Sequence, residues 1–336
     1  MTDVARIVAD VRARGEEAVR EWALRLDGAE PARAVAAGDL PAEALLALAD
    51  AVGRWHERQR PADVRLEVQS GVELERRWLP LESVGIYVPR GLVSTLVMCA
   101  VPAQAAGVER IVVATPPEGA GLVAAAAELL GLGDVWALGG PQAIAWLAYV
   151  QRVAKVVGPG NAYVNEAKLL VSRDVAIDLP AGPSEVVVLA GAGADRRVAE
   201  LELAAQGEHG PDAVCRLVVA DGDLEAALAE VEALAPEHLV LLGEDAEALA
   251  PRVRNAGSVF VGRSSPVAAG DYATGGNHVL PTGGWARSVG GLGLETFLKP
   301  VTVQRLTPEG LAALRPVVEA LAAVEGMPAH AEAVRR

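Results

Sequence analysis

SVGIYVP (residues 83–89) opens the part of the chain that decides the fold class. It is followed by three further apolar runs, VERIVVATPP (108–117), DVWALGG (134–140) and VAKVVGPGN (153–161), with alanine-rich segments of helical character between them. Strands that alternate with helices form parallel βαβ units, whose sheet is covered on both faces. The four runs therefore predict a parallel α/β domain.

The same pattern restarts after VAIDLPAGPSE (175–185). The segments that carry it are EVVVLAGAGADRRVAELELAAQ (185–206), AVCRLVVADGDLEAALAEVEALAPEHLVLL (213–242) and AGSVFVG (256–262). We therefore expect two Rossmann-like α/β domains in series. The expected boundaries are 1–60 for an N-terminal helical arm, 61–184 and 185–300 for the two α/β domains, and 301–336 for a small C-terminal tail, with 61–83 as a segment that could pack on the second domain.

The two ends of the chain predict helices. Residues 4–60 repeat apolar positions at helical spacing, and Pro61 closes the segment. Near the other end, VTVQRLT (301–307) predicts a strand and PEGLAALRPVVEALAAVEG (308–326) a helix. This tail is too small to form a core of its own, so we expect it to pack against the rest of the chain or against another subunit.

Composition excludes several classes of function. A formal charge of −14 argues against a nucleic-acid partner, which requires a basic face. No segment is long and apolar enough to span a membrane, and the acidic residues in the first helix argue against a secretory signal. Cys99 and Cys215 lie in apolar runs and are interpreted as buried core thiols, neither of them a nucleophile. A reducing cytosol is the expected compartment.

Two glycine-containing turns could approach a ligand. GAGADRR (191–197) follows a strand and opens a helix, but it lacks the third glycine of a dinucleotide fingerprint, so an ordinary turn explains it better. In GPGNAYV (158–164), Asn161 offers both a donor and an acceptor, although such a turn is more often structural. Ser184 in AGPSE could bind a substrate or cap a turn.

Four of the five histidines lie in polar segments flanked by glycine or proline, and only His56 is interpreted as incidental. His209 is three residues after Gln206, which places both side chains on one helix face; alone, this is a weak zinc signal. His238 follows Glu237 where a proline-terminated helix meets a strand. His278 lies in a long loop rich in glycine, GDYATGGNHVLPTGG (270–284), which also contains Asp271 and is typical of a functional site.

The last histidine, His330, lies five residues after Glu325 in EGMPAH, where an ordinary surface histidine would be the default expectation. With Gln206, Glu237 and Asp271, the four histidines could form a mixed nitrogen–oxygen metal site beside an acid–base pair. We expect Glu237 and His238 to project at a strand's mouth, the place where a parallel sheet presents its ligand-facing residues.

As a set, the motifs resemble the histidinol dehydrogenase family from about residue 4 to the C-terminus. The motifs that carry the resemblance are GIYVPRG, GGPQAIAWLAY, GPGNAYVNEAK, IDLPAGPSE, AAQGEHG, APEHL, SPVAAGDYATGGNHVLPT and EGMPAHAEAVRR. The resemblance implies a cytoplasmic zinc enzyme that oxidises L-histidinol through L-histidinaldehyde to L-histidine and reduces two NAD⁺. It also implies a homodimer in which the C-terminal tail reaches the partner's site.

The resemblance also implies a role for each matching residue. The implied zinc ligands are Gln206, His209, Asp271 and His330, and the implied acid–base pair is Glu237 and His238. The residues implied to contact substrate are Ser184, His278 and Glu325, together with the zinc ligands and His238. The implied NAD contacts in the first α/β domain are Tyr87, Gln142 and Asn161.

The chain departs from the family pattern in being shorter. The main gap lies between His209 and Glu237, where relatives carry an extra strand and helix, and a smaller loss lies beside Arg90, which replaces a glycine. Three alternatives stay open from the residues alone. They are a related dehydrogenase for another small polar alcohol, a zinc hydrolase, and a binding protein without activity.

Overall fold

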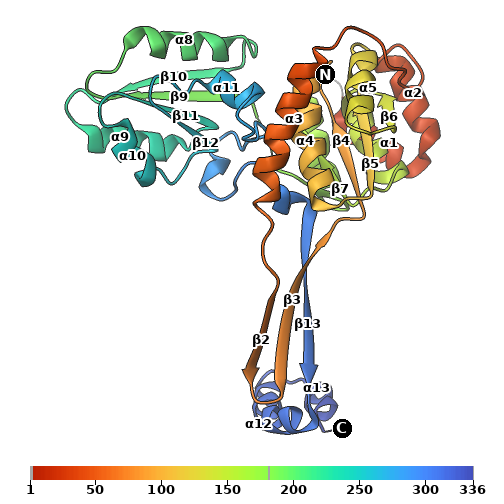
Figure 1. Ribbon diagram of the computed structural model, residues 1–336. Helices are drawn as coiled ribbons and strands as arrows, with labels where there is room; N and C mark the ends of the chain where they lie inside the picture. Colours follow the sequence, from red (N-terminus) through yellow and green to blue (C-terminus); the bar gives the residue numbers. More distant parts are fainter. Residues whose placement is uncertain (1–2, 181, 336) are drawn as a thin grey trace. The chain divides into compact units, whose positions relative to one another are not determined.

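The computed structural model describes residues 3–180 and 182–335. Within them the chain forms two compact units, which we describe separately. The first comprises the residues up to Gln59 together with Leu81–Phe297, and the second comprises Arg60–Pro80 together with the residues from Leu298 onward. Figure 1 labels many of the elements of both. No helix of the described residues is long and apolar enough to cross a membrane.

The first sheet of unit 1 has the strand order β1-β6-β5-β4-β7-β8. All its pairings are parallel except that of β1 with β6. Its strands are β1 (Ala32–Arg33), β4 (Ser83–Tyr87), β5 (Arg110–Thr115), β6 (Val135–Ala137), β7 (Lys155–Val157) and β8 (Ala176–Ile177). Because β5 and β6 extend the sheet to one side of β4 and β7 and β8 to the other, the order reverses between β4 and β7. Doubly wound sheets bind ligands at the carboxyl ends of the strands at this switch point.

Seven helices accompany this sheet, and their bounds are α1 (Val4–Arg14), α2 (Glu16–Leu26), α3 (Ala42–Glu57), α4 (Val93–Ala106), α5 (Ala120–Leu129), α6 (Gly140–Ala145) and α7 (Ala162–Val171). A π-helical turn, η1 (Trp146–Val150), extends α6. The apolar residues of the N-terminal helices α1 and α2 share one core with α6 and α7.

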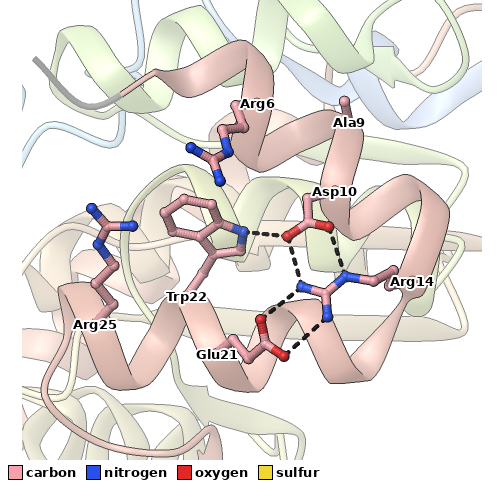
Figure 2. A pocket seen from close by; sticks show the side chains of 7 residues that line it. All are labelled: Arg6, Ala9, Asp10, Arg14, Glu21, Trp22 and Arg25. Carbon is pink, nitrogen blue, oxygen red and sulfur yellow. Dashed lines mark hydrogen bonds and ion pairs between the residues drawn. The ribbon is translucent and has the colours of Figure 1, made fainter.

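A polar network fastens α1 to α2, as Figure 2 shows. Asp10 accepts a hydrogen bond from the Trp22 indole at 2.8 Å and pairs with Arg14, whose guanidinium also reaches Glu21 at 2.8 Å. Arg6 and Arg25 each lie over the Trp22 ring, and these side chains line an open surface groove of about 670 Å³.

The second sheet of unit 1 is entirely parallel, with the order β10-β9-β11-β12. Its elements are β9 (Glu185–Ala190), α8 (Arg196–Gly207), β10 (Val214–Val219), α9 (Leu224–Leu234), β11 (His238–Leu242), α10 (Ala246–Leu249), η2 (Ala250–Arg252), β12 (Ser258–Val261) and α11 (Val267–Tyr272). Alternate residues of β9 and β11 enter separate apolar cores on the two faces of the sheet. Two short helical turns, η3 (Trp285–Arg287) and η4 (Leu294–Phe297), complete the unit.

The carboxyl edge of this second sheet is closed at its switch point, between β9 and β11. Gly191 N donates to Leu242 O at 2.8 Å, and Glu244 N donates to Ala192 O at 2.8 Å. These bonds join the loop that follows β9 to the loop that follows β11. Backbone therefore lies at the position where such sheets usually bind a ligand.

Unit 2 contains an antiparallel sheet, β13-β3-β2, and two helices. Its elements are β2 (Val64–Gln69), β3 (Val72–Pro80), β13 (Leu298–Leu306), α12 (Pro308–Val324) and α13 (Pro328–Ala333). The hairpin turns at Gly71, which has φ +74° and lies so close to the Thr307 cap of α12 that a Cβ would meet its hydroxyl at 2.5 Å. The C-terminal tail therefore folds together with residues 60–80.

The prediction of two parallel α/β layers in series is confirmed. The interpretation of Cys215 was wrong, because it is exposed on the edge strand β10, whereas Cys99 is buried. The strands β2 and β3 were not predicted. Their signal is the alternation of Val64, Leu66 and Val68 with polar residues, which is typical of a strand.

Candidate active site

Glu237 and His238 lie at the amino end of β11, where they are 6% and 3% exposed. Helix α9 ends at Leu234 and is capped by Ala235 in the left-handed region (φ 50°), and Pro236 then leads the chain into the strand. The expectation that the pair would occupy the ligand-binding edge of a parallel sheet was wrong, since that edge is the carboxyl one. Glu237 and His238 lie instead at the amino edge.

The Glu237 carboxylate is held by two donors. Its Oε2 accepts from Ser184 Oγ at 2.7 Å and from the Glu185 backbone N–H at 2.7 Å. Burial raises the pKa of Glu237 to about 8 against the ordinary 4.5, and the two hydrogen bonds only partly oppose this. A carboxyl group with such a pKa can exchange a proton near neutral pH, which suits general acid–base catalysis.

Ser184 joins Glu237 to Gln206. The Gln206 Nε2 group donates to Ser184 Oγ at 2.7 Å, so the hydroxyl accepts from the amide and donates to the carboxylate. This arrangement fixes the orientation of the Gln206 amide, whose buried Oε1 has no partner among the described residues. An unpaired buried carbonyl oxygen is costly unless something binds it.

His238 presents a free imidazole nitrogen. Its Nδ1 lies 3.1 Å from the Glu185 carbonyl oxygen, which can only accept, so Nδ1 carries the proton. Its Nε2, buried and without a hydrogen-bond partner in the described chain, lies 3.8 Å from Asp271 Oδ1. Burial lowers the pKa of His238 to about 4, so the ring is neutral at pH 7 with its lone pair available to take a proton.

Asp271 and His278 come from α11 and the loop that follows it. His278 lies 3.2 Å from the Asp271 carbonyl through Nδ1 and 3.3 Å from the Thr95 hydroxyl through Nε2. Both side chains line a cavity of about 40 Å³ with His238, which is large enough for water. Burial raises the pKa of Asp271 to about 6 and lowers that of His278 to about 4.

The glycine-rich loop is tied to the segment that carries Ser184. Gly182 N donates to Thr282 Oγ1, and Gly283 N donates to Glu185 Oε1 at 2.9 Å. Sequence reasoning did not single out Glu185, whose backbone also orients Glu237 and His238. Its position next to Ser184 in AGPSE was the available signal.

The predicted metal ligands of unit 1 share one region. Gln206 lies in the last turn of α8 and the exposed His209 just beyond it, and an interaction with His209 partly opposes the rise that burial causes in the pKa of Asp271. Among residues 3–180 and 182–335, no group of three or more His, Cys, Asp or Glu is placed to hold a metal. The predicted set has only two such residues in unit 1, and its other members are an amide and His330. The structure places His330 on α13 and Glu325 at the end of α12, both in unit 2.

The three predicted NAD contacts lie at or just beyond the carboxyl edge of the first sheet. Tyr87 ends β4, and its hydroxyl accepts from Gly140 N at 3.2 Å. Gln142 is buried and donates to Asp27 at 3.1 Å, and Asn161 caps α7. Tyr87 and Asn161 flank the switch point between β4 and β7. Burial raises the pKa of Tyr87 to about 12, so its hydroxyl stays protonated.

Fold and site together define an α/β enzyme with a nucleotide-binding strand order in its first sheet and a buried carboxyl–imidazole pair at the amino edge of its second. The family model described as Histidinol dehydrogenase matches residues 1–225 and 216–336. The chain belongs to the histidinol dehydrogenase family, whose members are NAD-dependent oxidoreductases of histidine biosynthesis. The resemblance found in the sequence is confirmed.

Relatives match almost the whole chain. Histidinol dehydrogenases from Methanosarcina mazei and Methanothermobacter thermautotrophicus are 38% and 39% identical, cover 99% of this chain and are themselves covered to 90% and 92%. The crystal structure of histidinol dehydrogenase from Elizabethkingia anophelis has a TM-score of 0.91 at 31% identity, covering 99% of this chain and 90% of that one. A succinate-semialdehyde dehydrogenase from Burkholderia pseudomallei, at 15% identity and a TM-score of 0.54, shares the fold alone, with 90% of this chain and 85% of that chain covered.

The alignments also reflect the short length of this chain. The match to the Methanosarcina mazei protein spans 392 positions, although the chain has only 336 residues. The two segments of the family match meet at residues 216–225, within the interval between His209 and Glu237 where the sequence predicts a missing strand and helix.

The raised pKa of Glu237 predicts a pH-dependent stability without metal. Folding raises the pKa of this carboxyl above its ordinary value of 4.5. Its contribution to the free energy of unfolding is therefore fully present below pH 4.5 and is lost as the pH rises toward 8. Between pH 5 and pH 8, the wild type should therefore lose at least about 1 kcal/mol of unfolding free energy relative to Glu237→Gln. Urea unfolding of both metal-free proteins measures this difference, and parallel profiles would contradict it.

Proposed function

We propose that this chain oxidises L-histidinol through L-histidinaldehyde to L-histidine, with zinc and NAD as cofactors. The observation that carries the proposal is the row Gln206–Ser184–Glu237, with both hydrogen bonds at 2.7 Å. It links a proposed zinc ligand, a proposed substrate contact and a proposed water activator. His238 presents its unpaired Nε2 beside this row.

The donor set fits zinc. Gln206 offers an unpaired buried oxygen, Asp271 a carboxylate and His209 an imidazole, and His330 of the partner subunit would supply the fourth ligand. Zinc bound there would act as a Lewis acid that holds the amine and imidazole of histidinol and so orients its carbinol group. Ser184, His278 and the partner's Glu325 would complete the contacts to the substrate, together with the zinc ligands and His238.

His238 and Glu237 would each carry out one of the two proton transfers. His238, neutral and unprotonated at Nε2, would take the proton of the substrate hydroxyl as the alcohol is oxidised. Glu237 would take a proton from the water that attacks the aldehyde, and its pKa of about 8 keeps it able to exchange that proton near neutrality. Cys99 is fully buried with a raised pKa, so a thiolate nucleophile does not arise there.

NAD would be the hydride acceptor in both oxidations. The switch point of the first sheet supports its placement there, because Tyr87 ends β4 and Asn161 lies in the turn that follows β7, the two strands at which the order reverses. Gln142, whose Oε1 is buried and unpaired among the described residues, would be the third contact.

A homodimer with shared active sites is supported by the surface of unit 2. Its strand β2 exposes Val64, Leu66 and Val68, and its helix α12 exposes Val317 and Leu321, all at more than 45%. Exposed apolar side chains grouped on one strand and one helix are typical of an interface. A cytosolic location without a nucleic-acid or membrane partner is proposed on the net charge of −14 and the biosynthetic family.

A substrate panel tests the proposal. Purified zinc-loaded protein with NAD⁺ should reduce the cofactor with L-histidinol and release L-histidine, at a rate far above that with other small amino alcohols. Faster turnover of another alcohol would assign a different substrate to the same fold. Turnover of an ester or amide without NAD⁺ would indicate a hydrolase, and no turnover at all would indicate a binding protein.

A further inference from the structure

A buried ion pair lies next to the switch point of the first sheet. Lys168 of α7 and Asp178, which follows β8, approach to 2.5 Å, and their side chains are 2% and 0% exposed. Removing two charges from water costs more than an ordinary ion pair returns, so a buried pair is poor evidence for stability alone. Its remaining hydrogen bonds indicate another role.

Both charged groups hold the backbone of one residue, Gly158. The Asp178 carboxylate accepts from Gly158 N through Oδ2 at 2.8 Å, and Lys168 Nζ donates to Gly158 O at 2.9 Å. The pair therefore fixes the peptide groups on both sides of Gly158, at the start of the GPGN turn.

Gly158 is held against the end of β4. Its φ is +111°, and a Cβ at this position would lie 2.2 Å from the carbonyl oxygen of Tyr87. Only glycine permits this conformation and this close approach. The GPGN turn and Tyr87, which flank the switch point, are therefore in direct contact.

The rest of the turn is fastened by α7. Asn165 Nδ2 donates to Gly160 O at 2.9 Å, and Asn161 Oδ1 accepts from Val164 N at 3.1 Å. Capping uses the oxygen of Asn161, so its amide nitrogen is available as a donor.

We propose that the Lys168–Asp178 pair is a positioning element for NAD. It holds the two peptide groups of Gly158 in place, and this fixes the positions of Asn161 and Tyr87 relative to each other. Without the pair, the GPGN turn can move away from β4. This inference rests on the proposed function, because it places NAD at the switch point. Neither charged group touches the cofactor, so both are positioning residues.

The double variant Lys168→Met/Asp178→Leu tests the proposal. It replaces the pair by apolar side chains of similar volume, which proteins often tolerate. It also removes both hydrogen bonds that hold the backbone of Gly158. We expect the Kd for NADH, measured by direct titration, to rise on the order of tenfold, because small displacements of binding groups have effects of this size or more. The KM for L-histidinol and the affinity for zinc should stay within about twofold of the wild type.

The matched control is Lys155→Met, which removes the partly buried lysine at the amino end of β7, bonded to Thr296 O at 2.5 Å. It should leave NADH affinity unchanged. If the double variant does not fold, Asp178→Asn replaces it, with an expected loss of about threefold or more in NADH affinity. NADH affinity equal to wild type in a folded variant overturns the proposal. A wild-type protein that does not bind NADH overturns the proposed function itself.

Discussion

Glu237→Gln is expected to slow the oxidation of L-histidinaldehyde by about 10²- to 10⁴-fold, the usual contribution of a general base. The oxidation of L-histidinol to the aldehyde should stay within a few-fold of the wild type. Glutamine keeps an oxygen that can accept from Ser184 and from the Glu185 N–H, so the local geometry should persist. It cannot take a proton from water, whereas the first oxidation uses His238.

Two rates of NADH formation measure this division, one with L-histidinol and one with L-histidinaldehyde as substrate. The matched control is Glu244→Gln, which changes a glutamate beyond the opposite end of β11 and should leave both rates unchanged. Equal losses in the two reactions would contradict separate roles for Glu237 and His238.

Mixing two inactive variants should restore activity if the active sites are shared. His209→Ala and His330→Ala each remove a proposed zinc ligand, and each homodimer should be inactive. In a heterodimer, one site combines the intact His209 of one chain with the intact His330 of the other. Random exchange makes about half of the dimers mixed, each with one intact site, so about a quarter of wild-type activity should return.

The measurement requires proof that subunits exchange, for example by native mass spectrometry of a mixture in which one variant carries a tag. As the control, each variant is taken through the same exchange procedure alone, and it should stay inactive. Inactivity after demonstrated exchange would show that His209 and His330 of one chain serve the same site.

The parallel strands could be predicted from sequence because they are buried on both faces. Runs such as VVVL in β9 and HLVLL in β11 contain almost no polar residue, which is typical of a covered parallel sheet. The hairpin β2–β3 escaped prediction because most of its residues are exposed, and its partner β13 lies more than 200 residues later in the chain. Local patterns do not reveal such distant pairing.

The residues of the site could be predicted from the sequence, but their arrangement in space could not. Nothing local to Ser184 shows that it lies between Gln206 and Glu237, because parallel pairing of β9 with β11 brings these segments together. The edge of the sheet was predicted wrongly for a related reason. The general rule favours the carboxyl edge, and only the bonds between the loops after β9 and β11 show that this edge is closed.

The two proposed sites thus lie at opposite edges of their sheets. The first has a switch point flanked by Tyr87 and Asn161 at its carboxyl edge, as expected for a nucleotide-binding sheet. The second carries Glu237 and His238 at its amino edge, where Ser184 and the backbone of Glu185 hold them. A buried, hydrogen-bonded acid–base pair needs such rigid support more than it needs a particular edge.

The central claim is a zinc site built from two subunits, and a crystal structure with zinc and L-histidinol tests it most directly. Anomalous scattering at the zinc edge should show one ion per site, bound by Gln206 Oε1, His209 and Asp271 of one chain and by His330 of the partner subunit. A zinc ion whose protein ligands all come from one chain, or zinc bound away from Gln206 and Asp271, would contradict a site shared between subunits.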